Sequence, residues 1–124
     1  MLYKIVIPGR PVPKERPRMN RQGKMYTPNK TKEYEQLVAK TARLIIPEPL
    51  KGDVRVDIKI YTSRVIGDLD NYIKSILDGL NNVAYNNDKQ ISIITAQRYI
   101  SEIERAEIDV TEVQEGGVKH ARVL

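Results

Sequence analysis

The sequence predicts an α+β fold (α/β-like) in which two helices pack on one face of a four-stranded mixed sheet. Apolar residues recur at helical spacing in two segments, and four other segments have strand-like composition or alternation, in the order β-α-β-α-β-β. The length of 124 residues argues for one hydrophobic core. We therefore expect a single domain over residues 1–124, with a tail at 114–124 that frays.

A strand, a helix and a second strand are expected in the first half of the chain. The β-prone run at 2–7 ends at Pro8. A helix begins at Asn29 and ends before Pro47. Residues 53–62 alternate strictly between apolar and polar side chains, which is typical of a strand with one buried face. The apolar face expected of the helix comprises Tyr34, Leu37, Val38, Ala42 and Ile45.

A second helix and two further strands are expected in the second half. The helix runs from about Leu69 to Asn81 and is followed by a polar, Asn-rich loop. Residues 91–101 and 105–113 are expected to be strands, and the short segment 101–104 between them is suited to a hairpin. The core face expected of this helix comprises Leu69, Ile73, Ile76, Leu77 and Leu80.

Residues 8–28 are expected to form an extended, basic, proline-rich arm. Five prolines remove backbone donors and prevent a helix or a central strand. Six basic residues lie between positions 10 and 24 against one acid, Glu15, whereas basic and acidic residues cancel in the rest of the chain. This concentrated charge predicts a polyanionic partner, with nucleic acid the first candidate. The basic residues are Arg10, Lys14, Arg16, Arg18, Arg21 and Lys24.

The composition excludes several kinds of site. The chain has no cysteine, which excludes disulfides, zinc–thiolate sites and cysteine nucleophiles. Its single histidine, His120, argues against Ser–His catalysis and multi-histidine metal sites. No segment is apolar enough for a signal peptide or a membrane span, so we expect a cytoplasmic protein with no membrane partner.

Asp68 and Asp70 lie where the strand at 53–62 is followed by the second helix. Two carboxylates at this spacing can converge on a hard cation such as Mg²⁺, which prefers oxygen ligands and retains several waters. Gly67 immediately before them permits a sharp approach of the backbone. The alternative is that Asp68 caps the helix and Asp70 is a solvated acid in its first turn.

Three more charged residues follow, each with two interpretations. Lys74 lies one helical turn after Asp70, where it either stabilises charge on a phosphate or forms an ordinary ion pair. Asp78 points away from the expected core face, so it is a solvated acid or a partner of Lys74 more readily than a metal ligand. Asp88 is either a third ligand, returned to the Asp68–Asp70 pair by the next strand, or part of an Asn-Asn-Asp turn.

The run DLDNYIKSILDGLNNVAYNNDKQI at residues 68–91 resembles the signature region of the RusA-type Holliday-junction resolvases. The family pattern is D-x-D-N, then a lysine, an aspartate and a loop that ends in an acid before a strand. The N-terminal sequence PGRPVPKERPR resembles the opening of phage and prophage members, and the resemblance extends over about residues 3–112. Relatives often carry more than one acid in the loop, whereas here two asparagines precede the last acid. The matching positions are Asp68, Asp70, Asn71, Lys74, Asp78 and Asp88.

This resemblance implies a homodimeric, Mg²⁺-dependent endonuclease that resolves four-way DNA junctions, with Mn²⁺ as a substitute ion and no small-molecule cofactor. Asp68, Asp70 and Asp88 would bind the metal and Lys74 would assist catalysis, with Asn71 and Asp78 in supporting positions. Paired symmetric nicks suit a two-fold dimer that has one site in each subunit. The apolar strand at 91–100 is a candidate interface.

The basic arm would then follow DNA phosphates, and Arg64 would add a further phosphate contact. Met25 and Tyr26 either stack or wedge at an opened junction, or Tyr26 packs beneath the arm. Two other functions stay open. One is a non-catalytic DNA-binding module whose acids only cap a helix, and the other is a dimeric scaffold protein with no DNA affinity.

Overall fold

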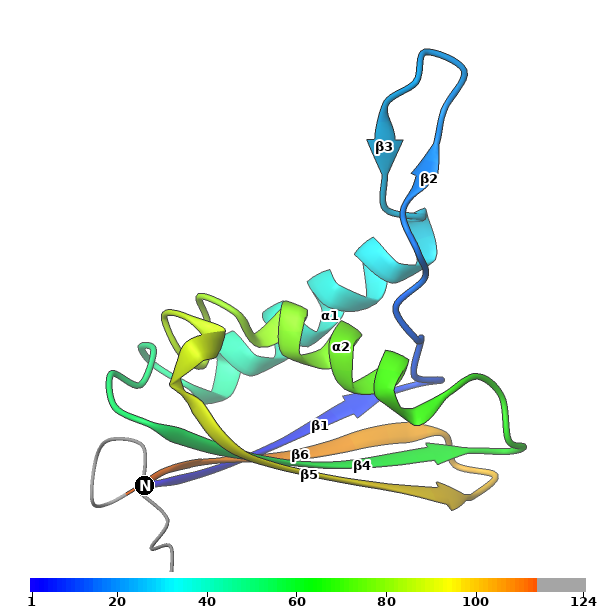
Figure 1. Cartoon of the computed structure of the whole chain (residues 1–124). Coiled ribbons are helices and arrows are strands. Elements are labelled where there is room, and N and C mark those ends of the chain that lie inside the picture. Colours follow the sequence, from blue (N-terminus) through cyan, green and yellow to red (C-terminus); the bar gives the residue numbers. More distant parts are fainter. Residues whose placement is uncertain (114–124) are drawn as a thin grey trace, which may run out of the picture.

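The computed structural model describes residues 1–113 as a four-stranded sheet covered on one face by two helices (Figure 1). The spatial order of the strands is β1-β6-β4-β5. Strand β6 runs antiparallel to both β1 and β4, whereas β4 and β5 are parallel. This confirms the expected mixed sheet and α+β class. The tail expected at 114–124 lies outside the described residues. The strands are β1 (Leu2–Pro8), β4 (Val54–Thr62), β5 (Ile91–Ile100) and β6 (Arg105–Glu112), and the helices are α1 (Asn29–Ile45) and α2 (Leu69–Leu80).

The hairpin expected between the last two strands does not form. Strands β5 and β6 lie on opposite sides of β4, so the segment 101–104 passes across the carboxyl end of β4 instead of turning back on β5. The backbone N–H of Ser101 donates to the carbonyl of Thr62, the last residue of β4, over 2.9 Å. The short segment is long enough for this crossing because it spans a single intervening strand.

The core lies between the sheet and the two helices. The inward side chains of β4 are all buried, as its alternation predicted. The helix faces are rotated from the expected ones. In α1, Thr31 is buried while Leu37 and Ile45 are exposed, and in α2 the buried positions are centred on Tyr72 and Ile76. The remaining buried residues of α2 are Ser75, Gly79 and Leu80.

Helices α1 and α2 approach closely at Gly79. A methyl group at this position would lie 2.8 Å from Cβ of Val38 and 2.9 Å from the carbonyl oxygen of Glu35. These separations are too short for nonbonded carbon contacts, so a glycine permits the two helices to pack at this distance. The contact positions α2, and with it the loop that precedes α2, over the sheet.

The arm is partly ordered, which its prolines did not predict. Its distal part is a hairpin of two short strands, β2 (Arg18–Met19) and β3 (Met25–Tyr26), that projects away from the body of the domain (Figure 1). The root of the arm is bound to α2 by two hydrogen bonds. The N–H of Lys14 donates to the carbonyl of Asn71 over 2.8 Å, and the hydroxyl of Ser75 donates to the carbonyl of Val12 over 2.7 Å.

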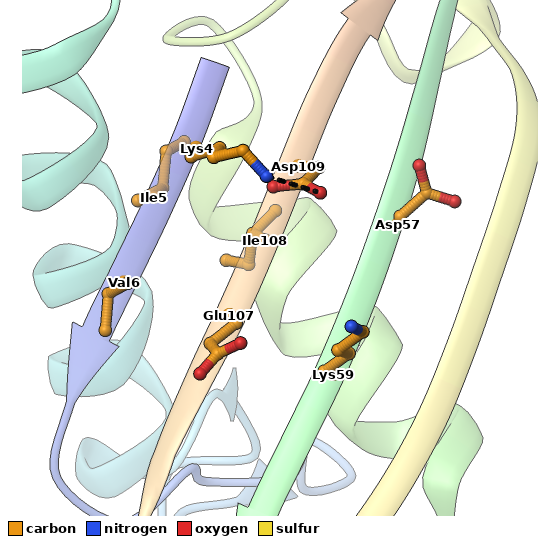
Figure 2. Close-up of a pocket in the computed structure, with 8 residues that line it drawn as sticks. All are labelled: Lys4, Ile5, Val6, Asp57, Lys59, Glu107, Ile108 and Asp109. Atoms are coloured by element: carbon orange, nitrogen blue, oxygen red, sulfur yellow. Dashed lines mark ion pairs between the residues drawn. The ribbon is translucent and has the colours of Figure 1, made fainter. Parts of the chain in front are cut away.

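The face of the sheet that the helices do not cover is charged. Figure 2 shows a depression on this face where Lys4 pairs with Asp109 over 3.7 Å. Asp57 lies opposite Asp109 on the neighbouring strand, where Arg55 pairs with it over 3.0 Å. Charged side chains of both signs indicate a solvated face. Neither described helix is long and apolar enough to cross a membrane.

We predict that Gly79→Ala destabilises the fold by about 1–3 kcal/mol, because the added methyl overpacks the contact between the helices and outweighs the better helix propensity of alanine. Urea denaturation measures the change. The matched control is Gly52→Ala, whose methyl would lie 3.7 Å from its nearest neighbour, an oxygen of the Glu112 side chain. A Gly79→Ala protein as stable as this control would contradict the prediction.

Candidate active site

Asp68 and Asp70 lie at the amino end of α2, next to the carboxyl end of β4. Gly67 has φ of +68°, which turns the chain into the helix and is costly for other residues. Asp68 occupies the N-cap position, yet its side chain makes no capping hydrogen bond. Both aspartates are exposed. The interpretation of Asp68 as a simple helix cap is therefore not supported by its geometry.

Two residues that the sequence analysis missed hold the loop before these aspartates. The hydroxyl of Tyr72 donates to the carbonyl of Ile66 over 2.7 Å. Nη2 of Arg98, on β5, donates to the carbonyl of Gly67 over 2.7 Å, and its guanidinium lies 5.5 Å from the centre of the Tyr72 ring. Burial raises the pKa of Tyr72, with a smaller opposing effect of Arg98. Tyr72 and Arg98 thus fix the backbone that carries the acid pair.

A sequence signal for both residues exists. Tyr72 is four positions before Ile76, which places it on the same helix face as a core residue. Arg98 is the one charged residue in the ten-residue strand β5. A single charge in a strand of this composition indicates a specific partner for that side chain.

The root of the arm and the acid pair line one groove. Residues of both segments line it, so positive residues of the arm border the two aspartates. Pro13 is near Gly67, where a Cβ on the glycine would lie 3.4 Å from the proline ring. The arrangement can hold a polyanion with one of its phosphates beside the aspartates. The lining residues are Pro13, Lys14, Glu15, Arg16, Pro17, Arg18, Gly67, Asp68, Asp70 and Asn71.

Lys14 is engaged inside the protein. Its Nζ lies 2.6 Å from a carboxylate oxygen of Glu35 on α1 and 3.1 Å from one of Asp78 on α2. Burial disfavours the charged ammonium, but hydrogen bonds to the two carboxylates outweigh this effect and raise the pKa of Lys14. Its side chain is 22% exposed, so the ammonium joins the arm to both helices and is not a free DNA contact.

Asp78 and Lys74 form an ordinary ion pair with each other, which is one of the two interpretations that the sequence left open for each residue. Nζ of Lys74 lies 3.3 Å from Asp78, and Lys74 is largely exposed. Asp78 is half-buried and also pairs with Lys14, which corrects the expectation that it points into solvent. Lys74 thus lies on the same helix as the acid pair, with its ammonium directed to the later turn.

The other basic residues of the arm are exposed. Arg18 pairs weakly with Glu15 over 3.3 Å. Nε of Arg10 donates to Glu104 over 3.0 Å, and Glu104 also accepts from the N–H of Ser63, which lowers the pKa of this carboxyl. Tyr26 is exposed on the hairpin, so the expectation that it packs beneath the arm is wrong. Exposed side chains also include Arg16, Arg21, Lys24, Met25 and Arg64.

Asp88 does not return to the acid pair, which corrects the sequence interpretation. Because β5 is parallel to β4, the residue before β5 lies at the amino end of β4, whereas Asp68 follows its carboxyl end. Helix α2, about 18 Å long at 1.5 Å per residue, separates the two ends. Asp88 begins the short 3₁₀ helix η1 (Asp88–Gln90), which Asn87 caps. Within residues 1–113, three acids do not gather into a metal-binding group.

Residues 8–111 match the family model described as endodeoxyribonuclease RusA. The chain belongs to the RusA family. The match covers the arm, both helices, the acid pair and nearly all of the last strand. The chain is also similar to a protein of Bacillus subtilis (strain 168) named "Uncharacterized protein YqaN", with 30% identity over 136 aligned residues that cover 89% of this chain and 96% of that protein.

Membership of the RusA family supports nuclease activity on DNA. The family consists of endodeoxyribonucleases that act on branched DNA, and they generally depend on a divalent metal. The resemblance at residues 68–91 therefore pointed to the correct family.

We predict that Tyr72→Phe lowers the free energy of unfolding by about 0.5–1.5 kcal/mol, because the hydroxyl that bonds Ile66 is lost at a buried ring. Chemical denaturation measures the loss. Tyr99→Phe is the control, since the Tyr99 hydroxyl bonds Gln97 at the surface and its removal changes stability by less than about 0.5 kcal/mol. Equal losses in the two variants would show that the Tyr72 hydroxyl does not hold the loop.

Lys14→Met is expected to destabilise the fold in a pH-dependent way. The folded state raises the pKa of Lys14 above its ordinary value of 10.5, so its contribution to stability is complete below pH 10.5 and is lost as the pH rises through the folded pKa. Chemical denaturation between pH 7 and 11 measures the difference in the free energy of unfolding between wild type and variant. We expect this gap to narrow at the alkaline end. Lys24→Met, at an exposed lysine without an ion pair among residues 1–113, shows no such gap. A gap for Lys14→Met that stays constant to pH 11 would refute the role of the ion pairs.

Proposed function

We propose that this chain is a Mg²⁺-dependent, structure-selective endodeoxyribonuclease that resolves four-way junctions by paired symmetric nicks during DNA recombination and repair. It acts in the cytoplasm as a homodimer. One observation carries the proposal: the carboxylates of Asp68 and Asp70 are exposed in a groove whose other side is the basic arm. Family membership supplies the DNA substrate class.

The two aspartates fit a divalent cation. Neither side chain has a hydrogen bond or an ion pair to another residue in the range 1–113, so both carboxylates are available. Carboxylate oxygens are the ligands that Mg²⁺ takes in proteins, and two of them leave room for water. Asp68 and Asp70 would hold Mg²⁺, or Mn²⁺ in its place, and the bound ion would supply an activated water and neutralise charge on the phosphate.

The remaining side chains bind and orient the DNA. Arg16 and Arg18 border the acid pair and would hold phosphates beside the scissile one. Arg21, Lys24 and Arg64 extend the positive surface. Arg10 would also contact DNA once its hydrogen bond to Glu104 breaks. Lys74 would stabilise charge at the phosphate after release from Asp78. Lys14 keeps the arm in position, with Asp78 as its partner, and Asn71 fixes the arm through its backbone carbonyl.

The exposed hairpin suits an opened junction. Met19 and Met25 are directly paired across β2 and β3, and Arg18 is opposite Tyr26. Their exposed apolar and aromatic groups would stack on bases or wedge between them where strands part. The arginines on the same hairpin would neutralise the adjoining phosphates.

A second candidate is a non-catalytic DNA-binding module with the same fold. The separation of Asp88 from Asp68 and Asp70 favours it, because a single subunit then provides two carboxylates in place of three. This module would bind junctions through the arm without cutting them, with affinity that falls steeply as salt rises.

A nicking assay on a labelled four-way junction and a matched linear duplex tests the proposal. We predict paired symmetric nicks in the junction alone, present with Mg²⁺ and absent with EDTA. Asp70→Asn should slow nicking by on the order of 10²–10³-fold, the usual cost of removing a group that stabilises transition-state charge, while junction binding persists. Asp109→Asn, on the open face of the sheet, is the matched control and should nick normally. A junction that wild type binds but never cuts with any metal would favour the DNA-binding module.

A further inference from the structure

Asp78 binds one lysine with each of its two carboxylate oxygens. Oδ2 lies 3.1 Å from Nζ of Lys14, which belongs to the root of the arm. Oδ1 lies 3.3 Å from Nζ of Lys74, which is on the same helix as Asp78. Asp78 therefore connects the arm to the lysine that we propose to act at the phosphate.

The side chain of Lys74 points in the less favourable direction for a helix. Helical side chains tilt toward the amino end, and an acid four residues before a lysine is a better partner than an acid four residues after it. Asp70 is the acid before Lys74, and Asp78 is the acid after it. Lys74 nevertheless pairs with Asp78, and this is its one ion pair among residues 1–113. Asp78 thus draws the ammonium away from the acid pair.

Lys14 competes with Lys74 for the negative charge of Asp78. Both ammonium groups bind one carboxylate, so each reduces the attraction that the other experiences, and the two like charges repel. Lys14 is also held by Glu35 over 2.6 Å, and its side chain is 22% exposed, against 60% for Lys74. An exposed single ion pair is weak. Lys74 is therefore the partner that Asp78 releases more easily.

We propose that Asp78 is a positioning residue that holds Lys74 away from the acid pair, and that Lys14 weakens this hold when the root of the arm is in place. The inference rests on the proposed function for the role of Lys74 at the phosphate, but the two positions of the Lys74 side chain stand independently of it. Once released, the ammonium turns back by one helical turn toward Asp70. It is then free to pair with a phosphate that is bound beside the aspartates.

The root of the arm has attachments that do not involve the Lys14 ammonium. The backbone N–H of Lys14 donates to the carbonyl of Asn71, and the hydroxyl of Ser75 donates to the carbonyl of Val12. A variant that lacks only the ammonium keeps both of these bonds, while Asp78 loses one of its two partners. The effect of Lys14 on Asp78 can therefore be separated from the attachment of the arm.

Single-turnover nicking of the four-way junction tests the positioning role. We expect Asp78→Asn to speed the nicking step by about two- to five-fold, because it removes an ion pair of the strength usual at exposed helical positions and so releases Lys74. Lys14→Met should slow the step by a similar factor, because Asp78 then binds Lys74 alone. Saturating enzyme and Mg²⁺ separate these rates from the affinity for the junction. A slower Asp78→Asn protein would overturn the proposal.

The double variant distinguishes positioning from attachment of the arm. In the Asp78→Asn background, Lys14 no longer shares a carboxylate with Lys74, so the slowing by Lys14→Met should disappear. If Lys14 acted only as an anchor, Lys14→Met would slow nicking in both backgrounds, and that result would overturn the proposal. Glu35→Gln is the matched control. It removes the other carboxylate from Lys14 but leaves Asp78 in place, so it should not slow nicking.

NMR spectroscopy measures the position of Lys74 independently of nicking. The signal of its ε-methylene group, recorded without DNA and in EDTA, reports which carboxylate the ammonium binds. Asp70→Asn should leave this signal in place when Asp78 is intact. The same substitution should move the signal in the Asp78→Asn background, where Asp70 becomes the partner. An equal response in the two backgrounds would overturn the two positions of Lys74.

The outcomes separate the two proposals. A wild-type protein that never nicks overturns the proposed function, whereas the NMR measurement still decides whether Asp78 holds Lys74. A protein that nicks, but in which Asp78→Asn and Lys14→Met both slow the reaction, overturns the positioning role and leaves the proposed function in place.

Discussion

The parallel pairing of β4 with β5 is the constraint on which the rest of the structure depends. It requires a crossover, which α2 provides, and therefore places the start of α2 at one end of the sheet and the start of β5 at the other. Asp68 and Asp70 lie at the first end and Asp88 at the second. Close packing of α2 on α1 at Gly79 then keeps the crossover helix in place.

Much of the fold could be predicted from local patterns. The alternation of residues 53–62 and the helical spacing in the two helices gave element bounds within one or two residues of those observed. The side of β4 on which β6 pairs was not predictable, because loop length alone does not distinguish a hairpin from a short crossing. The rotation of the helix faces was missed for a related reason. Tyr72, Ser75 and Thr31 are polar by type and buried through tertiary hydrogen bonds.

The sequence indicated candidate residues for the site, but not how the fold arranges them. The spacing of Asp68, Asp70 and Lys74 marked one end of a helix, and the charge count marked the arm. The sequence analysis assumed that the strand after α2 brings Asp88 back to this pair. Because β5 is parallel to β4, however, Asp88 precedes β5 at the amino end of β4, away from Asp68 and Asp70. Lys14 was expected to contact DNA because it belongs to the basic cluster of the arm. The two carboxylates that pair with it, Glu35 and Asp78, are 21 and 64 positions away in the sequence, so the pairing was not visible there.

The attachment of the arm to α2 has a mechanical consequence. Its root is bound to Asn71 and Ser75, within the two turns of helix that follow the acid pair, while the hairpin extends beyond the last of these bonds. The root of the arm is therefore held in place beside the turn that carries Asp68 and Asp70. A nucleic acid strand bound by Arg16 and Arg18, as we propose, would lie along the groove that these residues share with the two aspartates. On this proposal, bending of the hairpin would follow the shape of a branched substrate while the root keeps its place on α2.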